Sequence, residues 1–215
     1  MGDLPANPLA IELTLANREL WWQTKDTEDR PEYWKVSADV WDLEVCPDEH
    51  RHVGDLWLAV AELNPDRCFL DMIEPEQWVL ELIAETVLDL ASGTLVSELD
   101  DQISDGVPRM VILSRFQLDE VWRGFGLAGP LIASTLERFS NTARLGVCHV
   151  SPAYFMQECP DRISAELTCV RLGELLGRVG FHLWKDVHVV DLRDRALIDA
   201  GLEPLQRWGP CGGQQ

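Results

Sequence analysis

A glycine-rich stretch, VWRGFGLAGP at residues 121–130, constrains the fold more than any other part of this 215-residue chain. The apolar run before it, residues 110–118, predicts a strand, and the apolar residues after it recur at a helical spacing. Because glycine lacks a Cβ atom, backbone N–H groups there can approach an anion and φ can be positive. Pro130 suits the first turn of a helix that begins near Gly126, where N–H groups have no intrahelical partner. The stretch therefore predicts a strand–turn–helix unit whose amides wrap around a phosphate.

The stretch matches two phosphate-binding patterns. Gly124, Gly126 and Gly129 form G-x-G-x-x-G, the spacing of a dinucleotide-binding turn. That turn needs its first glycine directly after the strand and an acidic residue about 20 residues later. Here the polar link 119–123 separates strand from glycine, and no carboxylate ends the next predicted strand at 145–150. A dinucleotide-dependent oxidoreductase is therefore the least favoured of the functions considered below.

The second pattern, R-x-x-G-x-A, is formed by Arg123, Gly126 and Ala128. At this point the chain resembles the GNAT superfamily of N-acetyltransferases, whose pyrophosphate loop carries R/Q-x-x-G-x-G/A between a strand and a helix. LERF at 136–139 ends the helix where the family's helix ends. LLGRVGF at 175–181 is similar to the family's "LYEKLGF" signature before the late strands. The resemblance covers roughly residues 107–190.

The resemblance implies an α/β (mixed α+β) fold, with a splayed central mixed sheet flanked by helices. Residues 1–215 are expected to form a single domain, with core motifs at 107–190 and a helical insertion at 64–108. The order strand–helix–strand–helix–strand in the C-terminal half also predicts at least one parallel strand pair. The strands expected from the patterns span 10–16, 35–45, 53–63, 110–118, 145–150 and 181–192, the last as one or two short strands.

Three further patterns concern helices and a loop. Glu74-Pro75-Glu76 is typical of a helix start. A stripe of apolar residues at helical spacing follows it, and Gly93 can end that helix. A second apolar stripe predicts another helix, which ends at Gly180. The acidic segment 97–106 predicts a mobile surface loop. The first stripe consists of Val79, Leu82, Ile83, Val87 and Leu90, and the second of Ile163, Leu167, Val170, Leu175 and Val179.

The resemblance implies acetyl-CoA, or a related acyl-CoA, as the donor substrate. The strand end from Phe116 to Leu118 would pair with the pantetheine arm. The backbone amides that would hold the pyrophosphate belong to Arg123, Gly124, Phe125, Gly126, Leu127 and Ala128.

Acyl transfer also needs a base for the amine and an acid for the leaving thiolate. Where many family members place a tyrosine acid, this chain has Leu176. Tyr154 is the nearest phenol in sequence, and His149, near the position of a glutamate base in some relatives, has a suitable intrinsic pKa. A structural role for either residue stays open at this stage, and Cys148 is expected to belong to the core.

The overall charge bears on the ligands and partners. The chain carries 18 basic and 37 acidic residues, for a formal net charge of −19. Such a field repels nucleic acid and anionic membranes, and it favours a small cationic or peptide amine as acceptor. The six cysteines form no C-x-x-C pair and no cluster with histidines, so no metal is expected. No apolar run is long enough for a signal peptide or a membrane span, which indicates a cytoplasmic protein.

Two functions of different classes follow. The favoured one is an N-acetyltransferase that moves an acetyl group from acetyl-CoA to a primary amine by direct transfer. The alternative is a non-catalytic acyl-CoA-binding sensor or regulatory protein, which the leucine at 176 keeps open. The family resemblance also makes a homodimer a reasonable expectation.

Overall fold

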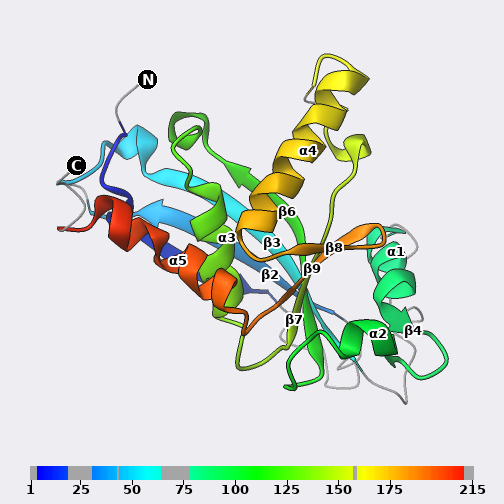
Figure 1. Ribbon diagram of the computed structural model, residues 1–215. Helices are drawn as coiled ribbons and strands as arrows, with labels where there is room; N and C mark the ends of the chain where they lie inside the picture. The colour runs from blue at the N-terminus through cyan, green and yellow to red at the C-terminus, as the bar shows by residue number, and fades with distance from the viewer. Residues whose placement is uncertain (1–3, 19–30, 43, 64–77, 157–158, 211–215) are drawn as a thin grey trace.

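A mixed seven-stranded sheet with helices on both faces forms the centre of the protein (Figure 1). The computed structural model describes residues 4–18, 31–42, 44–63, 78–156 and 159–210. The sheet order is β1-β2-β3-β6-β7-β9-β8, and among these neighbours only β6 and β7 are parallel. The fold is therefore mixed α/β, as expected. The strands are β1 (Ile11–Asn17), β2 (Glu32–Val40), β3 (His52–Glu62), β6 (Arg109–Leu118), β7 (Leu145–His149), β8 (His182–Trp184) and β9 (Val187–Asp191).

The strands lie near their predicted positions, with one clear error. The apolar residues in 35–45 shift from positions 36, 38 and 40 to positions 41, 43 and 45, and this change of phase predicts one strand with a bulge near it. β2 instead ends at Val40, and Trp41 and Val45 are exposed. The change of phase marks the end of the strand. The register shift between β2 and β3 lies earlier, between Ala38 and Asp39.

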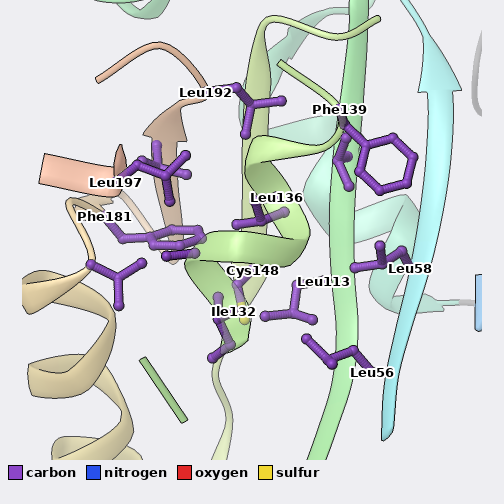
Figure 2. Close-up of a cluster of buried hydrophobic side chains, with 14 of the residues drawn as sticks. Leu56, Leu58, Leu113, Ile132, Leu136, Phe139, Cys148, Phe181, Leu192 and Leu197 are labelled. Carbon is purple, nitrogen blue, oxygen red and sulfur yellow. The ribbon is translucent and has the colours of Figure 1, made fainter. Parts of the chain in front are cut away.

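One face of the sheet is covered by α3 (Ala128–Glu137), α5 (Arg195–Trp208) and the second half of α4 (Arg162–Arg178). Figure 2 shows how apolar side chains from α3 meet those of β3 and β6 on this face. Ile132 and Leu136 are fully or almost fully buried there. Truncating such a side chain to alanine typically costs about 2–5 kcal/mol of stability. This packing fixes α3, and with it the glycine-rich turn, against the sheet.

The opposite face is covered by the described part of the insertion. It consists of α1 (Trp78–Val87), a hairpin of β4 (Leu88–Asp89) and β5 (Thr94–Leu95), and the short α2 (Ser97–Asp100). The stripe predicted for α1 is too long, because the chain enters the hairpin after Val87 and Leu90 is exposed. The expected helix start at 74–76 lies outside the described residues.

The prediction of a surface loop at 97–106 is wrong for residues 97–100, which form α2, and correct for the exposed turns that follow at 101–106. Leu99 and Ile103 are nevertheless buried against the sheet. Arg144 fixes the segment: its Nη1 is 2.7 Å from Asp100 Oδ1, and its Nη2 and Nε donate to the carbonyls of Ile103 and Ser104 at 2.9 and 3.1 Å. Asp191 adds a further contact by accepting from the N–H of Ser104 at 2.8 Å. Burial of two apolar residues and pairing with distant polar side chains therefore anchor this acidic segment.

The face predicted for α4 is correct only near its C-terminal end. Leu175 and Val179 pack on the core, whereas Ile163, Leu167 and Val170 are exposed. Figure 1 shows the first half of α4, in yellow, standing clear of the sheet, so no core lies beneath those side chains. Gly180, with φ of 101°, ends the helix as expected.

Candidate functional site

A cleft opens where β6 and β7 part. These strands pair at three positions, of which the last joins Ile112 to Val147. Beyond them, within the part of the chain that the structure describes, β6 pairs only with β3 and β7 only with β9. The gap holds a cleft of about 640 Å³, within the usual volume range of small-molecule sites. Its walls come from residues 113–118 of β6, Cys148 and His149 of β7, Tyr154 and Phe155, and α4 from Thr168 to Leu176.

The glycine-rich turn follows directly from the rim of this cleft. Gly124 and Gly126 have φ of 84° and 80°, a backbone region that side chains with a Cβ rarely adopt. Gly129 differs, because it lies inside α3 and a Cβ there would meet Val179 at 3.3 Å. The three glycines of the G-x-G-x-x-G pattern thus have two roles. Two shape the turn, and the third lets α3 pack closely on the end of α4.

Buried and hydrogen-bonded neighbours hold the turn in place. Trp122 is fully buried, and its Nε1 donates to the carbonyl of His50 at 2.8 Å. Arg123 donates from Nε to the carbonyl of Leu118 at 2.9 Å, which ties the turn to the end of β6. Asp119 caps a short 3-10 turn by accepting from the N–H of Val121. The loop between strand and helix is therefore preorganised by contacts on both sides.

The N-terminus of α3 has no side-chain cap. The helix begins at Ala128, and Leu127 before it offers no hydrogen-bonding side chain. Pro130 lies in the first turn, as expected, where its missing N–H costs nothing. The unpaired N–H groups and the positive end of the helix dipole at this terminus favour an anion.

An aromatic cluster stands at the wall of the cleft formed by β7. His149 Nδ1 and Tyr154 Oη lie 2.6 Å apart, a hydrogen-bond distance. Trp78, the first residue of α1, stacks on Tyr154 with ring centroids 6.1 Å apart and meets His149 edge-on at 6.0 Å. The structure therefore joins the two predicted catalytic side chains and adds a tryptophan from the insertion.

Burial sets the protonation states in this cluster. Desolvation lowers the pKa of His149 below its usual 6.5, although the negative charge of Asp186 opposes the shift. Burial raises the pKa of Tyr154 to about 12, with a contribution from Cys148. Burial also raises the pKa of the Cys148 thiol to about 12. At neutral pH the cluster thus holds a neutral imidazole beside a protonated phenol, and Cys148 is a buried thiol of the core, as expected.

The charge of the cleft is opposite to that of the chain. Of the described residues that line it, Arg115, Arg123 and Arg171 are basic and none is acidic. A fourth arginine, Arg207 at the end of α5, lies on the glycine-rich turn, since a Cβ at Gly126 would meet its Nη1 at 2.9 Å. No ion pair joins any of the four to a carboxylate among the residues that the structure describes. The net charge of −19 therefore does not extend into the cleft.

The predicted residues are only part of this site. Phe116, Leu118 and Arg123 line the cleft, and residues 124–128 continue from its rim. Leu176 also lines it and is fully buried. The sequence patterns did not indicate Trp78, Arg115, Arg171 or Arg207. No local motif marks them, because tertiary packing of separate elements brings them to the site.

Comparison with known proteins adds no family assignment. Neither a scan against models of protein families nor a search of curated proteins finds a match to this chain. Within the described part of the chain, no helix is long and apolar enough to cross a membrane. The same residues include no group of three or more His, Cys, Asp or Glu side chains arranged to hold a metal ion.

Proposed function

We propose that this protein is a GNAT-type N-acetyltransferase that moves an acetyl group from acetyl-CoA to a primary amine. The observation that supports it best is the cleft between the parting parallel strands, with an anion-binding turn at one side and a His–Tyr pair at another. The turn offers unpaired N–H groups, two glycines with positive φ and two arginines. These groups suit a pyrophosphate.

Residues 113–118 of β6 have no strand partner on the side of β7 among the described residues, so their backbone groups are available to an extended amide-bearing arm. The pantetheine arm of acetyl-CoA carries such amides. Bound along this edge, it would place the thioester toward the point where the two strands meet. An N–H group of the unpaired edge would then stabilise the developing oxyanion.

His149 and Tyr154 supply the proton transfers in this proposal. When Nδ1–H of His149 donates to Tyr154 Oη, the Nε2 atom is free to accept a proton from the attacking amine. The C–N bond forms and the C–S bond breaks, and the phenol gives its proton to the leaving thiolate. Protonation of His149 strengthens its donation to Tyr154 and makes the phenol a better acid. The products are the N-acetyl amine and CoA with its thiol protonated. The imidazolium then returns a proton to the phenolate, so both side chains are neutral again and no net proton is released.

The test combines binding with turnover. Acetyl-CoA at 100 times its Kd should stabilise the native state by about 2.7 kcal/mol, whereas NADH should not. Gly126→Trp should abolish this stabilisation, and Gly177→Trp, at an exposed helix position with open space around its Cβ, should keep it. Thiol release that rises with added amine would support the enzyme. Absence of stabilisation by acetyl-CoA would refute the proposal.

The second candidate, an acyl-CoA sensor without turnover, is favoured by one observation: Leu176 occupies the position of the family's usual acid and is fully buried. Tight acetyl-CoA binding without amine-dependent thiol release would favour it. The cationic acceptor, the cytoplasmic location and the homodimer remain predictions from the sequence.

A further inference from the structure

Arg115 lies on the same face of the sheet as His149, across the gap between β6 and β7. Its neighbours along β6, Leu113 and Phe116, pack toward the core under α3, whereas the Arg115 guanidinium lies over Trp57, 5.1 Å from the ring centroid. Trp57 alternates along β3 with residues that point toward α3, so it points the opposite way. His149 likewise contacts Trp78 of α1 on that opposite face. We therefore place Arg115 and His149 together on the face that carries α1.

The two side chains also lie at similar depth in the gap. β6 and β7 last pair at Ile112 and Val147, and His149 is two residues further along β7. Arg115 is three residues further along β6, but the register between β3 and β6 shifts at this point and leaves Ser114 as an extra residue. Both residues line the same cleft. An acceptor amine that attacks a thioester at the split would therefore lie between them.

The positive charge of Arg115 is available to a ligand. Its Nη2 donates to the neutral amide oxygen of Gln117 at 3.0 Å, and no described carboxylate pairs with it. Lys35, the other cation beside Trp57, is already paired with Asp55 at 3.0 Å. The glycine-rich turn packs with α3 on the other face, so a phosphate bound there would not neutralise Arg115. One unpaired guanidinium thus faces the side from which an amine would approach.

We propose that the acceptor amine carries a carboxylate, as an α-amino acid does, and that Arg115 binds this carboxylate. This inference rests on the proposed function. A guanidinium fork matches a carboxylate in bidentate geometry, and one positive charge balances one negative charge. The carboxylate on Arg115 would direct the amine toward the thioester and His149, and Trp78 and Tyr154 would form an aromatic wall beside it. In this inference the positive charge of the cleft, and not the net negative charge of the whole chain, determines which acceptor binds.

The test uses acetyl-CoA with each standard α-amino acid, its primary amide and its decarboxylated amine, and measures thiol release by the full-length protein. At least one amino acid should be acetylated, with kcat/KM at least 10-fold above that of its amide and amine. Arg115→Gln should raise KM for that acid about 10- to 100-fold, as expected for loss of a charged pair. The values for the amide should change little. Arg195→Gln, an exposed control on α5, should behave as wild type.

The other outcomes separate this inference from the proposed function. If amines and amides are acetylated as fast as the acids, or if Arg115→Gln keeps the preference for the acid, the inference is overturned and the acetyltransferase stands. If acetyl-CoA stabilises the protein but no amine of any class releases thiol, both the transferase and its acceptor are overturned.

Discussion

Tyr154 is the residue whose chemistry is easiest to isolate. Its hydroxyl touches His149, and its ring is stacked on Trp78, so Tyr154→Phe removes the proposed acid while keeping the stack. We expect kcat to fall about 10²-fold or more, the usual size of a general-acid contribution. The Kd of acetyl-CoA should stay the same, because Tyr154 is not part of the glycine-rich turn. Steady-state kinetics and calorimetric binding measure the two quantities, and an unchanged kcat would show that the thiolate takes its proton elsewhere.

The two partly buried histidines make stability depend on pH. Burial lowers the pKa of His149 and His188 in the folded state, and the charge of His149 lowers that of His188 further. The unfolded chain binds protons at these residues near pH 6.5, so between that pH and the lower folded-state values it carries more protons than the native state. Stability therefore falls as the pH drops below about 6.5.

Thermal melts between about pH 7.5 and 5.5 would measure this effect. The loss of Tm toward acid should be smaller in His188→Gln than in wild type, because one of the two titrating groups is gone. His182→Gln, which changes an exposed histidine of β8, should keep the wild-type slope. An equal slope in His188→Gln and wild type would contradict the assignment.

At the scale of elements, α5 completes the turn that β6 and α3 begin. Arg207 stacks on Trp208 with its guanidinium 4.7 Å from the ring centroid, and it lies against Gly126. We expect Arg207→Ala to weaken binding of CoA about 10-fold by removing a charged contact to phosphate. Isothermal titration should show no such loss for Arg195→Ala, at the other end of α5. Equal affinity of Arg207→Ala and wild type would show that the arginine only covers the turn.

A glycine within a helix and a glycine in a turn should respond to substitution in opposite directions. Gly177 lies in α4 with open space around its Cβ position, so Gly177→Ala should raise stability by about 0.5–1 kcal/mol through higher helix propensity. Gly124 also has open space, but its φ of 84° should make Gly124→Ala cost about 1–2 kcal/mol. Denaturant unfolding measures both. A destabilising Gly177→Ala would mean that this part of α4 has a neighbour that the monomer does not show.

Local signals predicted some elements well, and packing decided the others. The turn at 121–130 was predictable, because its glycines, its proline and the helix after it are all local features. The exposure of the first half of α4 was not predictable from the sequence. Periodicity indicates which residues of a helix share an apolar face, but it does not indicate whether the sheet extends beneath that face. The helix at 97–100 pairs with Arg144, more than 40 residues away, and buries Leu99 against the sheet. Among the cleft residues, His149 and Tyr154 were predicted as separate candidates. The binding role proposed for Arg115 could not be predicted from the sequence, because it follows from the position of Arg115 opposite His149.

At the scale of the whole molecule, the junction between the two halves of the sheet is also the proposed binding site. β1, β2, β3 and β6 form one half of the sheet, and β7, β9 and β8 form the other. Three register pairs between β6 and β7 join the halves directly, and the core under α3 bridges them. A ligand that hydrogen-bonds to both facing edges would therefore act as an additional link between the halves.

Hydrogen exchange tests this arrangement for the molecule as a whole. Acetyl-CoA should slow exchange of amides on the facing edges, residues 113–118 and 148–149, and on the turn at 124–129. Where local opening releases the ligand, exchange should slow by up to about 100-fold at 100 times the Kd. Amides of the β1–β2 pair, which lie far from the cleft in the strand order, should change much less. Protection confined to the turn would place the phosphates there but leave the split strands outside the binding site, because an arm lying along β6 must shield the edge that β7 leaves open.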